Sequence, residues 1–274
     1  MVQTLVDQLG RRLTLAVPPR RIVSLCPSTT ETLFALGAGD RVVGRTTYCR
    51  HPKEAIDTLP SIGGTKTVDE QRLRALKPDL ILSVREENDE QQIDALSHDL
   101  PILILDPVDV ASALNGIRLI GAALGREQDA DELAEAIASA FRTLPRLDGY
   151  RAAYLIWRKP FMAAGAGTYI NDVMAHLGLE NAAPKTDRYP AVDAQALAAN
   201  PPHFLFAASE PFPFADKHLP ELQRLAPTAR IVLVDGEMFG WHGVRMLKAA
   251  RYFEQHVPLW NSALEQTSGK EDGR

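Results

Sequence analysis

The sequence has little cysteine, no excess of basic charge and no long hydrophobic run. Its 274 residues include only two cysteines, Cys26 and Cys49, so a framework of several disulfides is excluded, although a single bridge between them stays open. Lys and Arg number 30 against 35 Asp and Glu, so the basic footprint of a nucleic-acid-binding protein is missing. No apolar run reaches the roughly 18 residues needed to cross a bilayer. The composition therefore predicts a globular chain that neither binds nucleic acid nor spans a membrane.

The N-terminus lacks a basic stretch followed by an apolar core, because Asp7, Arg11 and Arg12 interrupt any such core. No signal peptide is predicted. The chain as printed is therefore expected to be cytoplasmic, and a chain from which a leader had been removed would be periplasmic.

Motifs of catalysis and of structural zinc are also missing. There is no Cys-x-x-Cys, no nucleophile elbow, no phosphate loop and no complete Gly-x-Gly-x-x-Gly. The nearest pattern, residues 163–167 (AAGAG), lacks the third glycine and predicts a small-residue loop that a large ligand can approach closely. No catalytic residue and no resident cofactor are predicted.

Short apolar runs rich in β-branched residues alternate with amphipathic stretches along the whole chain. Strands rich in apolar residues and separated by helices are typical of parallel sheets covered on both faces. The strands are predicted at residues 21–25, 41–46, 79–83, 101–105, 151–157, 203–207 and 230–234. A first helix is expected to begin at a capping box of Ser28 and Glu31 and to end at Gly37.

The middle and the two halves of the chain indicate how it is organised. Residues 108–146 have a helical pattern that ends at Pro145, with Gly125 as a point where it can break into two helices. Residues 68–78 and 192–202 share Val, Asp, Gln, Leu and a final Pro at identical offsets before a strand. We predict two Rossmann-like α/β lobes with parallel sheets, residues 1–107 and 147–274, joined by a single long backbone helix within 108–146.

Ligands of open parallel sheets bind beyond the carboxyl ends of the strands, and unusual side chains are dense in those predicted loops. Flat side chains there can stack on a ring, and charged ones can contact a polar rim. Each can also serve a structural role instead, such as core packing for tryptophan or helix capping for the acidic residues. The predicted ligand-binding residues are Tyr48, Cys49, Lys66, Arg85, Glu86, Trp157, Arg158, Tyr189, Phe212, Trp241, His242 and Arg245.

Several motifs resemble those of the mature periplasmic iron-siderophore and cobalamin-binding proteins. They are residues 6–11 (VDQLGR), 19–31 (PRRIVSLCPSTTE), 35–37 (ALG) and 75–81 (ALKPDLI). Residues 44–49 (GRTTYC), 63–66 (GGTK), 85–88 (REEN), 156–160 (IWRKP) and 241–243 (WHG) look closer to the leaderless cobalamin-binding-like branch of the helical backbone metal receptors. The resemblance implies two lobes joined by a rigid helix, with a ligand cleft between the lobes that holds a metal chelate. It also implies that Arg245 corresponds to a cleft arginine.

The chain departs from that family at two positions. The family usually carries a Glu on each lobe, seven residues before the Pro that precedes a strand, and these glutamates dock on arginines of an ABC permease. This sequence has Gln71 and Gln195 there, and an amide cannot form the ion pair. The resemblance therefore supports the binding site more strongly than it supports a permease partner.

The favoured interpretation is a non-catalytic binding protein that clamps cobalamin or another corrinoid, as in ABC-type uptake. A ferric siderophore or haem is the next ligand class. The residues also leave open a cytosolic enzyme or chaperone that handles a corrinoid or metal, and a metal-ion receptor. The receptor would draw its ligands from His51, Glu86, Glu210 and His242.

Overall fold

The computed structural model describes the backbone of residues 2–268 and the side chains of residues 2–262. It divides into two compact units, which are described separately below. Unit 1 comprises residues 1–107, 111–138 and 241–246, and unit 2 comprises residues 108–110, 139–240 and 247–274. Residues 241–246, from the C-terminal part of the chain, belong to unit 1, and residues 108–146 are divided between the two units.

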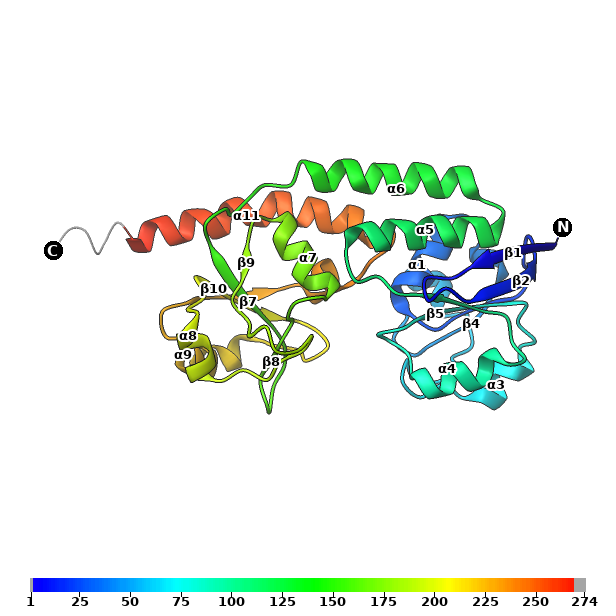
Figure 1. The fold of residues 1–274 in the computed structure, drawn as a ribbon, viewed down its shortest axis with the longest axis horizontal. Helices are drawn as coiled ribbons and strands as arrows, with labels where there is room; N and C mark the ends of the chain where they lie inside the picture. Colours follow the sequence, from blue (N-terminus) through cyan, green and yellow to red (C-terminus); the bar gives the residue numbers. More distant parts are fainter. Residues whose placement is uncertain (1, 269–274) are drawn as a thin grey trace. The chain divides into compact units, whose positions relative to one another are not determined.

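Unit 1 contains a four-stranded parallel sheet (Figure 1). Its order is β4 (Val42–Arg45), β3 (Ile22–Ser24), β5 (Leu80–Val84) and β6 (Ile102–Leu105). The associated helices are α1 (Pro27–Ala35), the 3-10 turn η1 (Gly39–Arg41), α2 (Lys53–Ile56), α3 (Glu70–Ala75) and α4 (Glu90–Ser97). Strands β3, β5 and β6 are buried at every residue, as expected of strands covered on both faces.

The start of α1 differs from the prediction, although its end does not. The N-cap is Cys26 and no side chain caps the helix, so the expected capping box of Ser28 and Glu31 is wrong. Both side chains instead bond to residues 242–245, far along the chain. Gly37 ends the helix with a φ of 68°, and its N–H donates to the carbonyl of Phe34, which confirms the predicted left-handed cap.

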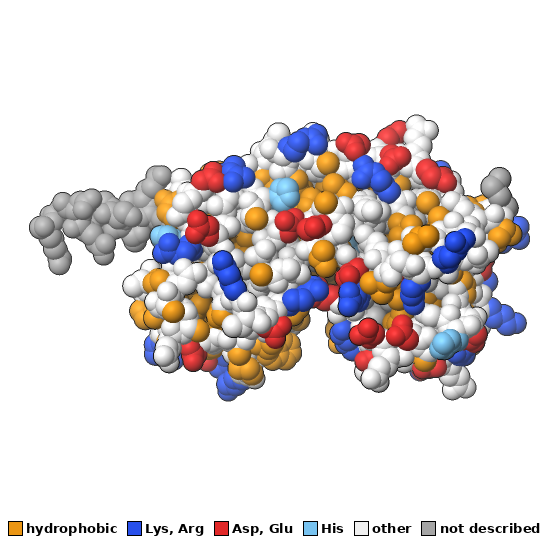
Figure 2. All heavy atoms as spheres, viewed as in Figure 1, with side chains coloured by type: hydrophobic (Ala, Val, Ile, Leu, Met, Phe, Trp, Pro, Cys, Tyr) orange, Lys and Arg blue, Asp and Glu red, His pale blue; other side chains and the backbone are white. Residues whose placement is uncertain are grey.

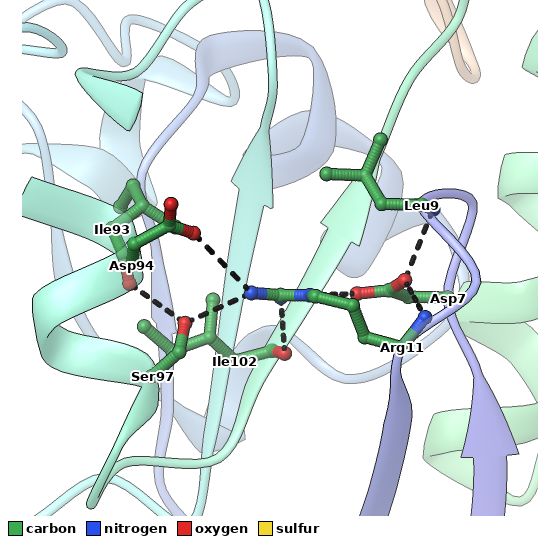
Figure 3. Close-up of polar contacts among 7 residues, drawn as sticks. All are labelled: Asp7, Leu9, Arg11, Ile93, Asp94, Ser97 and Ile102. Carbon is green, nitrogen blue, oxygen red and sulfur yellow. Dashed lines mark hydrogen bonds and ion pairs between the residues drawn. The ribbon is translucent and has the colours of Figure 1, made fainter. Parts of the chain in front are cut away.

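An N-terminal hairpin forms a separate two-stranded sheet, which the sequence reasoning missed. Strands β1 (Val2–Val6) and β2 (Arg12–Ala16) pair antiparallel, with Leu5 and Leu15 turned inward. Figure 3 shows how the turn is held. The buried Asp7 carboxylate accepts bonds from the N–H groups of Leu9 and Arg11 and from Arg11 Nε, and the Arg11 guanidinium reaches the Ser97 hydroxyl of α4.

Replacing Asp7 by Asn is expected to lower the free energy of unfolding by about 1–3 kcal/mol. The amide nitrogen of Asn would face the donor Nε of Arg11, which now lies 2.8 Å from a carboxylate oxygen. Urea denaturation measures the loss. Asp40→Asn is the matched control, because Asp40 is 83% exposed and its ion pair with Arg41 spans 4.0 Å. Equal effects of the two substitutions would contradict a structural role for the Asp7 network.

Two helices occupy the region predicted as the backbone helix. They are α5 (Val110–Leu124) and α6 (Glu127–Arg142), and Gly125 separates them with a φ of 66°. The break that the sequence allowed at Gly125 is therefore present, and α6 begins in unit 1 and ends in unit 2. Acidic and basic side chains are interspersed over α6 (Figure 2), and Arg118 of α5 pairs with Asp131 and Glu135 of α6.

Unit 2 contains the second mainly parallel sheet. Its order is β11 (Arg230–Val234), β10 (Phe204–Ala208), β7 (Arg151–Trp157) and β8 (Met162–Ala163), with β8 antiparallel; β9 (Glu180–Asn181) also pairs with β7. The remaining elements are α7 (Tyr169–His176), α8 (Ala194–Ala199), η2 (Asp216–His218), α9 (Leu219–Leu225), α10 (Gly236–Gly240) and α11 (Arg245–Ser268). The α/β class with two parallel-sheet lobes is thus confirmed.

The repeated segments have the same local structure in both units. Asp69 caps α3 through the N–H of Arg72, and Asp193 caps α8 through the N–H of Ala196. Each helix then leads through a proline into a central strand, β5 or β10. Gln71 and Gln195 are exposed in the first turns of these two helices.

Candidate functional site

A buried polar cluster lies at the beginning of α1 in unit 1. The Thr30 hydroxyl lies 3.1 Å from Cys49 Sγ and donates to the carbonyl oxygen of Cys26. The Thr46 hydroxyl is a second neighbour of Cys49 Sγ at 3.3 Å. Both cysteines are free thiols and almost fully buried, and burial raises the pKa of the Cys26 thiol. Cys49 therefore lies beneath the surface that carries Tyr48, and its predicted contact with a ligand stays a prediction.

Residues 241–245 dock against α1. His242 Nε2 lies 2.9 Å from the Ser28 hydroxyl, and the Val244 N–H donates to Thr32 Oγ1. Gly243 has a φ of 77° and packs so closely that a Cβ would collide with the Thr32 hydroxyl. Since no non-glycine side chain fits there, the glycine of the predicted WHG motif serves this docking.

Two predicted ligand residues of this segment are buried. Arg245 Nε donates to Glu31 Oε2 at 2.7 Å, and the two side chains are 4% and 10% exposed. His242 is 8% exposed, and burial lowers its pKa to about 4, so its imidazole is neutral at pH 7. These positions show how the segment is anchored and leave direct ligand contact by His242 and Arg245 as a prediction.

Trp241 is surrounded by cationic and aromatic side chains. The guanidinium carbons of Arg245 and Arg50 lie over its ring, at 5.0 and 5.9 Å from the centroid. The His51 ring meets it edge-on at 5.7 Å. Trp241 is only 9% exposed, whereas Tyr48, on the same turn as Arg50, is 59% exposed. On unit 1, Tyr48 is therefore the predicted stacking residue with an open face.

The charged residues predicted at the ends of β5 and nearby are held by other protein groups. Arg85 Nη1 donates to Asp106 at 3.1 Å, and the Arg85 side chain remains 51% exposed. Lys66 Nζ donates to the carbonyl oxygens of Glu86 and Asn88 at 2.6 and 3.0 Å. Lys66 thus joins two loops, a role that its sequence position does not indicate.

Aromatic side chains gather at the carboxyl ends of β7 and β10 in unit 2. Trp157 is 42% exposed and meets Phe212 edge-on at 6.1 Å, and Phe212 in turn meets Phe214 at 4.8 Å. Arg158 pairs with Glu221 of α9 at 2.8 Å. The structure therefore brings Trp157 and Phe212 together, as a site with aromatic walls requires.

The small-residue loop at 163–167 accommodates another part of the chain. The Gly165 N–H donates to the Arg188 carbonyl at 2.7 Å, and a Cβ at Gly165 would collide with the carbonyl oxygen of Asp187. The segment packed here also carries Tyr189, which is half-buried. The backbone of residues 187–188 thus packs against this loop, and the close approach of a ligand stays a prediction.

The described residues contain no group of three or more His, Cys, Asp or Glu side chains placed to hold a metal ion. The same part of the chain has no helix long and apolar enough to cross a membrane. Asn88 and Glu31 of unit 1 have structural roles that the sequence did not predict. Asn88 also bonds to Leu25 and Thr65, 63 and 23 positions away, and Glu31 bonds to Arg245, 214 positions away, so no local pattern could reveal these partners.

The chain thus consists of two α/β units, each with a mainly parallel sheet and with polar or aromatic side chains at its strand ends. A family model described as "Periplasmic binding protein" matches residues 22–227. The chain belongs to this family. The predicted resemblance is therefore confirmed, and the named relatives are binding proteins rather than enzymes, in agreement with the prediction of a non-catalytic protein.

Curated relatives match part of the chain. The ABC transporter substrate-binding lipoprotein YvrC of Bacillus subtilis (strain 168), described as uncharacterized, is 35% identical over 146 residues, which cover 52% of this chain and 46% of that protein. The vitamin B12-binding protein of Yersinia pestis (strain Pestoides F) is 28% identical over 166 residues, or 59% of each chain. The chain thus spans about half of the length of the curated relatives it matches.

Solved structures resemble the chain over nearly its whole length. The periplasmic vitamin B12-binding protein BtuF of Vibrio cholerae has a TM-score of 0.72 at 18% identity and covers 90% of this chain and 99% of its own. The periplasmic heme-binding protein RhuT from Roseiflexus sp. RS-1 has a TM-score of 0.71 at 24% identity, with 89% and 99% covered. These likenesses establish the shared fold.

Proposed function

We propose that the chain is the substrate-binding component of an ABC-type uptake system and that its ligand is cobalamin or another corrinoid. The observation that carries the proposal is the exposure of two aromatic rings at strand ends, one in each unit. Tyr48 and Trp157 are the aromatic residues among the exposed large hydrophobic side chains that the structure describes. A flat apolar face left in water at a ligand-binding edge suits stacking on a planar macrocycle.

The polar surroundings support a ligand with both apolar and polar parts. Arg50 lies beside Tyr48, and Arg85 and Glu87 are exposed after β5, so the unit 1 surface carries charged groups of both signs near the exposed ring. A corrinoid presents an apolar ring edge together with amides and a phosphate. Haem and ferric siderophores share the flat or amphipathic shape and are the alternative ligands, and the names of the vitamin B12- and heme-binding relatives support both classes.

Titration of the purified protein with cyanocobalamin, haemin and ferrichrome is expected to give saturable binding of one of them. Calorimetry and the absorbance of each ligand measure it. Tyr48→Ala and Trp157→Ala should each weaken that binding about 5- to 30-fold, because loss of a stacked ring removes roughly 1–2 kcal/mol. Leu259→Ala is the control, since Leu259 is 65% exposed on α11 away from the strand ends.

Saturable binding of none of the three ligands would contradict the proposal. So would binding that neither aromatic substitution weakens. Turnover of a bound corrinoid by the purified protein would favour a corrinoid-handling enzyme instead. Stoichiometric metal without a chromophore would favour a direct metal-ion receptor.

The proposed partner is an ABC permease. The family that the chain resembles docks through a Glu on each lobe, but Gln71 and Gln195 occupy the exposed positions here. We propose that docking relies on contacts other than ion pairs at these two positions. Raising the salt concentration should then weaken the complex less than it weakens a complex made with Gln71→Glu and Gln195→Glu.

The compartment belongs to the same proposal. The proposed uptake role requires a periplasmic location, where a binding protein meets its permease, and a cytoplasmic location of the protein would contradict that role. Fractionation of native cells, followed by N-terminal sequencing of the protein, distinguishes the two.

A further inference from the structure

The side-chain amide of Asn88 lies where three backbone segments of unit 1 meet. Its Oδ1 accepts hydrogen bonds from the Ser83 hydroxyl at 2.8 Å and the Val84 N–H at 2.9 Å. Its Nδ2 donates to the carbonyl oxygens of Leu25 at 3.2 Å and Thr65 at 2.9 Å. Asn88 is 3% exposed, so these four bonds use the amide's donors and acceptor within the protein interior.

The three segments come from different parts of the strand-end surface. Leu25 follows β3 and precedes α1, Val84 ends β5, and Thr65 lies in the loop of residues 63–67. No backbone ladder joins the loop at 63–67 to the segment after β5 among the described residues. The Asn88 amide supplies such a link, because Asn88 closes the segment 84–88 through its own N–H to the Val84 carbonyl.

Lys66 makes a second link between the same loops. Its ammonium group donates to the carbonyl oxygens of Glu86 and Asn88, so both hydrogen bonds run from the loop at 63–67 to the segment 84–88. The side chain is exposed, and its charged end lies on these carbonyls. A lysine that bound a ligand anion directly would have to give up these two bonds.

The linked loop also supports the exposed aromatic residue. The Thr47 N–H donates to the Gly63 carbonyl at 2.8 Å, next to Tyr48 in the chain. A Cβ added at Gly64 would lie 3.5 Å from the Tyr48 ring. The position of the Tyr48 ring therefore depends on the loop that Asn88 and Lys66 hold.

We propose that Asn88 and Lys66 are positioning residues of the ligand site, which hold the loops 63–67 and 84–88 in their ligand-binding arrangement before the ligand arrives. This inference rests on the proposed function. Loops that are already ordered lose less conformational entropy on binding, so the pair raises affinity without touching the ligand.

Asn88→Asp tests the amide. The substitution keeps the shape and the Oδ1 acceptor but places an oxygen against the carbonyls of Leu25 and Thr65. Amide hydrogen exchange measured by mass spectrometry should become at least about tenfold faster in peptides covering 63–67 and 84–88, while the core of β5 is unchanged. Affinity for the probe that the unmodified protein binds, cyanocobalamin or haemin, should fall about tenfold. Asn200→Asp, an exposed residue at the end of α8, is the control for the added charge.

Lys66→Met and Lys66→Arg test the second link. Methionine removes both donors and should reproduce the faster loop exchange and the weaker binding. Arginine retains donors for the two carbonyls and should restore both properties toward those of the unmodified protein. Lys53→Met, which removes another exposed lysine, should change neither property.

The outcomes separate this inference from the proposed function. Absence of probe binding by the unmodified protein contradicts the proposed function, and the positioning role with it. Binding by the unmodified protein that Asn88→Asp and Lys66→Met leave unchanged contradicts the positioning role alone. Loss of affinity without faster exchange in the two loops also overturns it, because that result assigns the residues to direct ligand contact.

Discussion

Replacing Arg245 by Met is expected to lower the free energy of unfolding of unit 1 by about 3–5 kcal/mol. The guanidinium is 4% exposed and donates to Glu31 at 2.7 Å, so the substitution leaves a buried carboxylate without its positive partner. The change also removes the cation from the Trp241 ring, 5.0 Å away. The urea dependence of hydrogen exchange in peptides from α1 measures the loss within unit 1.

A double-mutant cycle separates the ion pair from the packing around it. Adding Glu31→Gln to Arg245→Met removes the buried charge, so the double variant should recover part of the stability lost by the single one. Arg72→Met is the matched control, since Arg72 is 69% exposed in its pair with Asp69 and such pairs contribute about 0–1 kcal/mol. A loss below about 1 kcal/mol for Arg245→Met would show that the buried pair does not anchor residues 241–245.

The strands and the docking of residues 241–245 show which features of the fold can be predicted from the sequence and which cannot. Strand β7 at 151–157 and strand β11 at 230–234 have the predicted bounds, because each coincides with an apolar run in the sequence, even though β11 is an edge strand in which only Val234 is buried. The docking of residues 241–245 on α1 joins positions 214 apart in sequence, and nothing near His242 or Ser28 indicates it. The pattern of Ser28 and Glu31 instead suggested a local cap, which competes for the same side chains.

The missed hairpin has a different cause. The strands β1 and β2 alternate exposed and more buried residues, and the signal is present in the residues 2–6 and 12–16. One buried leucine per strand gives a weaker hydrophobic pattern in the sequence than the long apolar runs of the later strands. The Asp7 and Arg11 network that anchors it depends on α4 and β6, which lie about 90 residues further on.

In the candidate site, the places of the exposed aromatic residues were easier to predict than the contacts of the charged residues. The exposed rings of Tyr48 and Trp157 lie at strand ends as the alternation of strands and helices predicts, since that alternation fixes where each strand stops. The charged residues were harder to place, because a long cationic side chain can turn either to a ligand or to nearby carbonyls. Lys66 lies on the carbonyls of Glu86 and Asn88, a choice made by loop geometry that no sequence pattern encodes.

Acidification from pH 6.5 to pH 4 is expected to remove about 3 kcal/mol of stability through His242 alone. Burial lowers the pKa of His242 to about 4 in the folded protein, whereas an unfolded histidine titrates near 6.5. Between these values the unfolded chain binds more protons than the folded one, so the free energy of unfolding falls as the pH falls. Above pH 6.5 the neutral imidazole predominates in both the folded and the unfolded protein, and the contribution of His242 to stability is fully present.

His242→Gln isolates the effect from the other titrating groups. An amide at this position can still reach the Ser28 hydroxyl, which lies 2.9 Å from Nε2, but it does not take up a proton. The slope of stability against pH between 4 and 6.5 should therefore be shallower in this variant than in the unmodified protein. His98→Gln, at an exposed histidine beyond α4, should retain the original slope. An equal slope in His242→Gln and the unmodified protein would mean that His242 is protonated in the folded state near its ordinary pKa. The segment 241–245 would then have to accommodate a buried positive charge beside Arg245.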